Sequence, residues 1–381
     1  MKTNVILALL ASALWLGGCT GSTTRIGSPD ADASSTPDGA SDAVLPDVAV
    51  DPGPPPVRYV LHEWGVFVFD GAGWSVHGPT PDVEVISVDK PVVYLYSDET
   101  FTLDLTVGFA SGGSTETWPL LPDGAFVDWD GLQVRPGPCE TTPFPTVYDE
   151  PWVEEPCEAC TLGSCVVPGA SCLTHGGTVA TLLFYAGTMP DYSAPLQASV
   201  WTEGVDGMIG FELSNVSGAR VHDVWFLYRT TTSTCEYMPE EYCPVATADL
   251  AFAYFDEVSA GSGFATSLEL VHLEAELDTS GMPIPGTLGS WDEWDSLPEE
   301  LRDALVERGL YGEEADAFMA AWDTALFGLL GWDSFSIEPM YRNGGALLYF
   351  MSDDDYEAQL PLEASPEPSE VVRLGMIYQH L

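Results

Sequence analysis

The sequence predicts a mostly β protein of antiparallel, sandwich-like architecture, with a C-terminal helical hairpin and two closing strands, and so an α+β fold overall. Between residues 57 and 277, segments rich in β-branched and aromatic residues alternate with joints rich in glycine and proline. Residues 101–109 place an apolar side chain at every second position, which is typical of a half-buried antiparallel strand. Near residue 296 the apolar period becomes helical.

The first residues predict export. Lys2 precedes an apolar run from Val5 to Leu16, and two glycines stand before Cys19. This run is too short to cross a bilayer and fits a signal peptide over residues 1–18. The segment resembles the lipobox of bacterial lipoprotein precursors, which implies cleavage before Cys19 and a lipid on that residue. A plain signal peptide with an incidental cysteine is the alternative. We expect a membrane-anchored lipoprotein of the cell envelope, at the outer membrane in preference to the inner one.

Residues 19–56 continue from the lipidated cysteine as a disordered acidic tether, because Ala, Asp, Ser, Pro and Gly bury too little apolar surface to fold. The whole chain has 59 Asp and Glu against 11 Lys and Arg, a formal net charge of -48. This charge argues against nucleic acid as a partner and against electrostatic docking on anionic lipid. The membrane is therefore expected to be reached only through the lipid on Cys19.

Residues 57–290 form the predicted β-rich domain. Its first strand is 57–69, and Pro91 is expected at the first position of a strand over 91–96, because proline donates no backbone hydrogen bond. If that strand is central, Val93 or its neighbours should be buried. Further strands are expected at 101–109, 178–186, 196–202, 208–213, 221–229, 248–255 and 267–277.

Residues 291–381 form the helical hairpin and closing strands, packed on the β domain. Ser296-Leu297-Pro298-Glu299 reads as a capping box at a helix start, and Gly309 ends that helix. The second helix has one apolar stripe made of Ala315, Phe318, Met319, Trp322, Ala325, Leu326 and Leu329. The closing strands are expected at 345–351 and 371–378.

Seven of the 8 cysteines follow Cys19, several of them in an insert over about residues 139–175. Outside the cytoplasm the default is disulfides, so Cys157, Cys160, Cys165 and Cys172 are expected to pair, as are Cys235 and Cys243. The alternative is a zinc site, because the spacings within Cys157, Cys160, Cys172 and His175 suit a metal. An oxidising compartment favours disulfides, so no metal or cofactor is expected.

No established catalytic motif is present, and no catalytic residue is assigned. The polar residues that could form a site are His62, Glu63, Lys90 and Arg373. His62 and Glu63 are adjacent on a strand and should point to opposite faces. Lys90, the only lysine after the signal peptide, is either a solvated residue at a strand start, which we favour, or an ion-pair partner of Glu63.

Several short motifs give the chain a family resemblance over roughly residues 60–380. They are Glu63-Trp64-Gly65, Lys90-Pro91-Val92-Val93-Tyr94-Leu95-Tyr96, Gly309-Leu310-Tyr311-Gly312-Glu313-Glu314-Ala315, Leu360-Pro361-Leu362 and Val372-Arg373-Leu374. On these residues the sequence resembles a group of uncharacterised exported bacterial proteins. The resemblance implies no activity.

The function predicted from these observations is that of a cell-surface binding or structural protein, and an enzyme is not favoured. A secreted hydrolase that uses carboxylates, with or without a metal, is the alternative, and a pocket that gathers the four polar residues would support it. An envelope protein or a carbohydrate is the expected partner. Trp291 and Trp294, flanked by acidic residues, are the best candidates for an exposed carbohydrate-stacking face.

Overall fold

The computed structural model describes residues 57–70, 74–75, 78–79, 86–144, 158–202, 207–233, 245–276, 289–328 and 344–381. All of them belong to one compact unit, Pro54–Leu381. The predicted signal peptide, Cys19 and the tether lie outside the described residues. None of the helices in these ranges is long and apolar enough to span a membrane.

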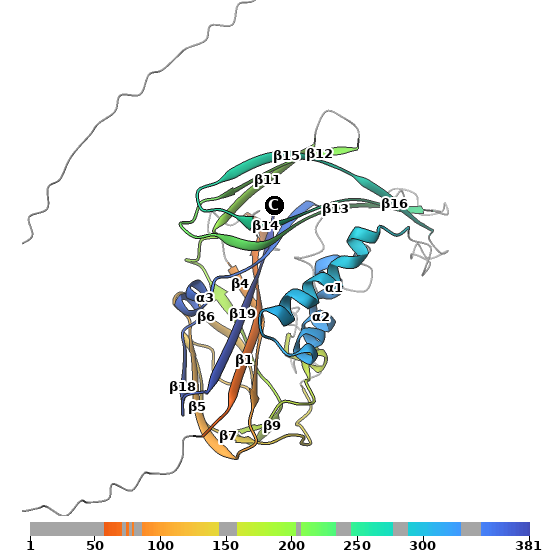
Figure 1. The fold of residues 1–381 in the computed structure, drawn as a ribbon. Helices are drawn as coiled ribbons and strands as arrows, with labels where there is room; N and C mark the ends of the chain where they lie inside the picture. The colour runs from red at the N-terminus through yellow and green to blue at the C-terminus, as the bar shows by residue number, and fades with distance from the viewer. Residues whose placement is uncertain are drawn as a thin grey trace, which may run out of the picture. The chain divides into compact units, whose positions relative to one another are not determined.

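The unit is built around a nine-stranded sheet in the order β16-β14-β13-β17-β19-β1-β4-β10-β6 (Figure 1). Its strands are β1 (Val60–Asp70), β4 (Ile86–Tyr96), β6 (Gly113–Trp118), β10 (Leu183–Met189), β13 (Val221–Ser233), β14 (Val245–Val258), β16 (Val271–Glu276), β17 (Gly344–Phe350) and β19 (Glu370–His380). The pairing is antiparallel except between β1 and β19, which run parallel. A fold that is mostly β and antiparallel is therefore confirmed, with one parallel pair at its centre.

Two smaller sheets cover one face of the nine-stranded sheet. A five-stranded sheet has the order β18-β5-β7-β8-β9, and a three-stranded sheet has the order β11-β12-β15. Their strands are β5 (Phe101–Gly108), β7 (Phe126–Arg135), β8 (Cys172–His175), β9 (Thr178–Ala180), β11 (Leu196–Thr202), β12 (Met208–Asn215), β15 (Gly263–Glu269) and β18 (Leu362–Ser365). A short pair, β2 (Trp74–Ser75) and β3 (Gly78–Pro79), completes the described strands. The inward side chains of these sheets, such as Leu103, Phe211 and Leu213, share a core with Phe67 and Phe69 of β1.

Helices cover the opposite face. They are η1 (Glu158–Cys165), α1 (Asp292–Glu307) and α2 (Gly312–Phe327), and α1 and α2 form the predicted hairpin (Figure 1). Their apolar residues, among them Leu297, Leu301 and Phe318, pack with Trp64 and Leu250 of the large sheet in a second core. A short helix, α3 (Asp353–Gln359), stands between β17 and β18. Gly309 ends α1 with φ +109, as predicted.

Pro91 departs from its predicted place. It lies inside β4 and not at its first position, at a register shift between β1 and β4 opposite Gly65. A Cβ added to Gly65 would stand 3.0 Å from Pro91 Cγ, so the glycine makes room for the proline ring. A bulge is where a sheet tolerates a residue without an N–H donor. Val93 is fully buried, as expected for a central strand.

Three further predicted boundaries are corrected. The expected strand over 178–186 is two strands, β9 and β10, and the one over 267–277 is also two, β15 and β16, which belong to different sheets. Helix α1 begins at Asp292, ahead of the predicted capping box, and Pro298 lies inside it. The Ser296 hydroxyl lies 3.0 Å from the carbonyl oxygen of Glu293, the back-bonding of a serine within a helix.

Candidate functional site

Two buried polar clusters lie on opposite faces of β1. In the first, the Glu63 carboxylate accepts hydrogen bonds from Arg373 Nε at 2.7 Å, from the Tyr356 hydroxyl at 2.9 Å and from the Tyr185 hydroxyl. Burial, followed by the charge of Glu63, raises the pKa of both tyrosines well above the usual tyrosine value. Both hydroxyls therefore stay protonated and donate. Arg373 also stacks over the Tyr356 ring at 4.4 Å. Glu63 is thus fully occupied by its neighbours.

The second cluster centres on Glu314 at the start of α2. Its carboxylate lies 2.7 Å from His62 Nδ1, accepts from the Tyr96 hydroxyl at 2.7 Å, and accepts from the backbone N–H of Tyr311 at 2.7 Å. Burial, followed by the charge of Glu314, raises the pKa of Tyr96. His62 and Glu314 are both buried, and the Tyr311 ring lies 4.5 Å from the His62 ring. This cluster ties α2 to the middle of the large sheet.

The structure therefore divides the predicted polar site. Glu63 and Arg373 are paired, while His62 faces the helices and has Glu314 as its partner. The prediction that His62 and Glu63 point to opposite faces is correct. Lys90 belongs to β4 by its backbone, but its side chain lies outside the described residues. The described members of the predicted site are thus not gathered in one place, since Glu63 and Arg373 lie on one face of the sheet and His62 on the other.

The cysteine predictions need one correction. Cys172 forms a disulfide with Cys139 and not with a cysteine of the 157–172 segment. Arg135, at the end of β7, pairs with Cys172 in β8. The segment after β7, which contains Cys139, therefore lies beside β8, and the Cα atoms of Cys139 and Cys172 are 5.9 Å apart. Because the Cys172 sulfur is used in this bond, the alternative zinc set with Cys157, Cys160 and His175 loses one ligand.

The remaining cysteine predictions fall largely outside the description. Cys157, Cys235 and Cys243 are not among the described residues, and neither is the side chain of Cys160. Cys165 is buried, with its sulfur 3.8 Å from the Ser164 hydroxyl. Within the described ranges no group of three or more His, Cys, Asp or Glu is placed to hold a metal ion.

An open pocket of about 500 Å³ lies between α1 and the strands β13 and β14. We call it the α1–β14 pocket, and its lining residues are Asp223, Trp225, Tyr254, Glu300, Asp303, Ala304, Glu307 and Arg308. Two aromatic side chains come from the sheet, and three carboxylates come from one face of α1. Four carboxylates stand against one guanidinium, so the pocket is strongly acidic.

Arg308 is already paired with a carboxylate of this pocket. Its Nη2 donates to Asp223 at 2.5 Å, and its guanidinium lies 4.1 Å from the centre of the Phe350 ring. The Tyr254 hydroxyl donates to the other oxygen of Asp223 at 2.6 Å. Burial alone would raise the pKa of Asp223, but these hydrogen bonds outweigh it and lower the pKa. The carboxylates of Glu300 and Glu307 have no described cationic partner, so the pocket's negative charge stays unbalanced within the described residues.

Asp223 also has an uncommon backbone. Its φ is +52, in the left-handed region that few residues other than glycine adopt. Asp and Asn tolerate this region better than other side chains do. The conformation places the carboxylate against Tyr254 and Arg308, and strain of this kind is often found at functional sites.

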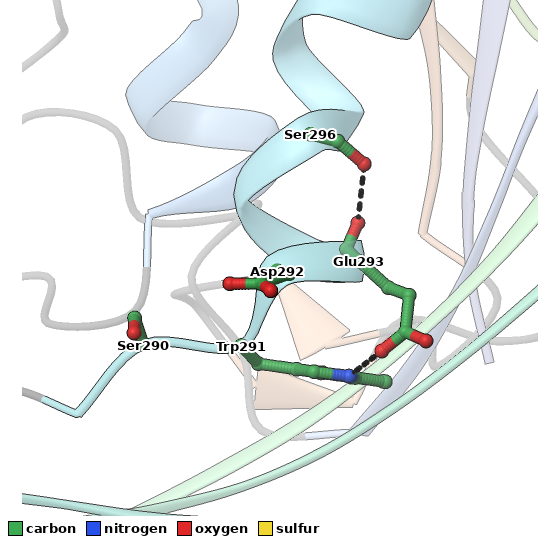
Figure 2. A pocket seen from close by; sticks show the side chains of 5 residues that line it. All are labelled: Ser290, Trp291, Asp292, Glu293 and Ser296. Atoms are coloured by element: carbon green, nitrogen blue, oxygen red, sulfur yellow. Dashed lines mark hydrogen bonds between the residues drawn. The ribbon is translucent and has the colours of Figure 1, made fainter.

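A second pocket of about 460 Å³ opens at the N-terminal end of α1, and its lining residues are Ser290, Trp291, Asp292, Glu293 and Ser296 (Figure 2). We call it the Trp291 pocket. The Trp291 indole N–H donates to the Glu293 carboxylate, as Figure 2 shows. The two pockets adjoin, because the Ser296 hydroxyl of one lies 2.8 Å from the Glu300 carboxylate of the other.

The prediction that Trp294 belongs to an exposed carbohydrate-stacking face is wrong. This residue is 2% exposed, and its indole N–H donates to the Phe327 carbonyl at 3.0 Å. Its ring stacks on the Trp291 ring, with centroids 6.2 Å apart, so the pair does not present two open faces. Trp291 is half-buried and lines its pocket.

Comparisons with known proteins give no family. No family model matches the sequence, and no curated protein matches it. Among solved structures, the chain is similar to the Fcho1 Mu homology domain of Danio rerio with bound Eps15 peptide, at 8% identity and a TM-score of 0.31, covering 85% of this chain and 97% of that one. It is also similar to the yeast delta-COP-I mu-homology domain complexed with Dsl1 WxWxV peptide, at 12% identity and a TM-score of 0.22, covering 61% and 89%. Likenesses this low do not bear on what the chain binds.

The α1–β14 pocket was not predicted from the sequence. The acidic residues Glu300, Asp303 and Glu307 recur at helical spacing, which is a signal for one shared face of α1. Among 59 acidic residues this signal does not stand out, and nothing local links that face to Asp223 or Tyr254.

Proposed function

We propose that this protein is a lipid-anchored binding protein of the cell envelope, and that it binds a cationic segment of a partner protein in the α1–β14 pocket. The observation that carries the proposal is the composition of that pocket. Tyr254 supplies an exposed aromatic ring, which packs on the buried Trp225, and Glu300, Asp303 and Glu307 supply carboxylates from α1. Lysine and arginine side chains are stabilised by both, through cation–π attraction and charge-assisted hydrogen bonds.

The charge of the chain supports the same type of partner. A formal net charge of -48 attracts a basic partner from about one Debye length away, a distance that is longest at low salt, and raises the rate of encounter. Since Arg308 is neutralised by Asp223, it does not cancel the field of Glu300 and Glu307, while Asp303 lies 3.5 Å from Arg302. Binding is therefore expected to weaken steadily as salt concentration rises.

The test is calorimetric titration of the purified protein with a short lysine-rich peptide, and with an acidic peptide of equal length as a control. The triple variant Glu300→Gln, Asp303→Asn and Glu307→Gln should weaken binding about tenfold or more. The matched control is Asp128→Asn, Glu212→Gln and Glu363→Gln, which removes the same charge from exposed positions on the two smaller sheets. Equal loss in both variants would show a general charge effect and would refute a binding role for the pocket.

The anchor is tested separately. With lipid on Cys19 the protein should partition with membranes and enter the detergent phase, because several acyl chains give stable attachment at about 0.8 kcal/mol per buried CH₂. The variant Cys19→Ser should become soluble after removal of the signal peptide. Membrane retention of Cys19→Ser at the level of the unaltered chain would contradict the proposed anchor.

A further inference from the structure

The two pockets on α1 have the same chemistry. Each combines an aromatic side chain with carboxylates: Trp291 with Asp292 and Glu293 in one, and Tyr254 with Glu300 and Glu307 in the other. They adjoin at Ser296 and Glu300, so one ligand can reach both without crossing the core.

We propose, on the basis of the function proposed above, that the site is bipartite: it binds an extended segment with two cationic side chains, one in each pocket. The lining residues of the two pockets are centred about ten residues apart on α1, or roughly 15 Å along the helix axis. An extended chain advances about 3.3 Å per residue, so this separation corresponds to about four or five residues. The preferred partner therefore carries two lysines or arginines with about three or four residues between them.

The neighbouring structure favours an extended ligand. The lining residues on α1, from Asp292 to Glu307, follow one face of the helix, and Trp225 and Tyr254 of the large sheet line the second pocket beside it. A surface that follows one helix face beside a sheet suits a single extended chain, whose alternate side chains point to one side.

Linking the two cations should increase affinity beyond that of either alone. Once one side chain is bound, the second encounters its pocket at a high effective concentration, provided that the linker spans the gap. A peptide with the correct spacing is therefore expected to bind about tenfold more tightly than a peptide with one lysine. Shorter spacings cannot reach both pockets, and binding should fall to the level of a single lysine.

The experiment is a titration with a series of synthetic peptides in which two lysines are separated by an increasing number of serines. A maximum in affinity at about three or four intervening serines supports the proposal. The variant Asp292→Asn with Glu293→Gln should remove this maximum, so that the two-lysine peptides bind it with the same affinity at every spacing. The variant Asp295→Asn with Glu299→Gln is the matched control, because these residues lie on the same helix and line neither pocket.

The outcomes separate the two proposals. If lysine peptides bind with equal affinity at every spacing, the bipartite site is overturned and the simpler cationic pocket survives. If no lysine peptide binds the unaltered protein, the proposed function itself fails. Melting temperatures of both variants show whether the loss of acidic residues in the first turn of α1 has unfolded the helix.

Discussion

Arg373 on β19 lies directly beside Glu63 on β1 in the register of the parallel pair, and its Nε donates to Glu63 Oε2 across 2.7 Å. Glu63 is completely buried, and the side chain of Arg373 is 9% exposed. Arg373 also contacts Glu357 of α3 at 2.6 Å. One guanidinium thus joins the central strand pair to a helix from the adjoining layer.

Removing this guanidinium should be costly. In Arg373→Met the carboxylate of Glu63 stays buried without a cationic partner, and we expect a loss of about 3–5 kcal/mol in the free energy of unfolding. Urea denaturation measures it. Arg302→Met is the control, because Arg302 pairs with Asp316 at the surface and its loss should destabilise the protein far less. A loss for Arg373→Met as small as that of the control would show that the buried pair does not stabilise the fold.

Enlarging Gly65 should also destabilise the protein. The substitution Gly65→Ala places a Cβ 3.0 Å from Pro91 Cγ and 3.1 Å from its Cα, and the backbone of β4 cannot easily move away. We expect about 1–3 kcal/mol of destabilisation, which a chemical denaturation curve can resolve. Gly218→Ala is the comparison, since nothing lies within 4 Å of a Cβ there. Equal stability of the two variants would mean that β1 and β4 are not packed as described.

Val93 and Lys90 provide a contrast within β4. Val93→Ala should cost about 2–4 kcal/mol, because it removes buried methyl groups and leaves a cavity. We expect Lys90→Ala to change stability by less than about 0.5 kcal/mol, since Glu63 has Arg373 as its cationic partner. Equilibrium unfolding of both variants side by side gives the comparison. A Lys90 effect as large as that of Val93 would show that the solvated interpretation of Lys90 is wrong.

The disulfide between Cys139 and Cys172 closes a loop with a sequence separation of 33. A loop of this length restricts the unfolded chain, and its removal is expected to cost about 3–4 kcal/mol. Peptide mapping without reduction should recover the two cysteines in one linked fragment. Cys139→Ala, Cys172→Ala and the double variant should all be destabilised to a similar degree. A double variant that is much less stable than either single one would indicate that the cysteines do not act as a pair.

Asp223 should make stability depend on pH. Its pKa is lowered in the folded state from an ordinary value of 3.8, so its contribution is fully present above that value and is lost as pH falls through the lower folded-state pKa. Asn at this position tolerates the left-handed backbone but carries no charge. The difference in unfolding free energy between the unaltered protein and Asp223→Asn should therefore be largest near neutral pH and shrink in acid. A difference that stays constant from neutral to acidic pH would contradict this role.

The sequence predicts the strands whose pattern is local. The predicted strand over 196–202 matches β11, and the predicted strands over 101–109 and 221–229 begin at the same residues as β5 and β13. Strand β7 was not predicted, although Val127, Trp129, Leu132 and Val134 are its buried residues. Gly131, with φ +68, shifts the alternation by one residue between Trp129 and Leu132. The interrupted period therefore looks irregular until the partner strand is known.

What could not be predicted depends on contacts between distant residues. Glu63 and Arg373 were both identified as polar residues of interest, but they are 310 residues apart and nothing local connects them. Glu314 was noted only within a motif, and its pairing with His62 depends on how α2 lies on the sheet. Similarly, the sequence predicts no partner for Cys139, because its position beside Cys172 follows from the pairing of β7 with β8. Pairing of this kind is decided by the whole fold and not by the neighbouring residues.

The position of β19 has a consequence for how the chain is made. In the large sheet, β19 stands between β17 and β1, so it joins the group β16-β14-β13-β17 to the group β1-β4-β10-β6. It is also synthesised after every other strand of that sheet. The ribosome therefore delivers both halves before the strand that unites them, and until then β1 and β17 each have an open edge. Completion of the sheet is thereby linked to completion of the chain, and a product that stops short of β19 is expected to aggregate.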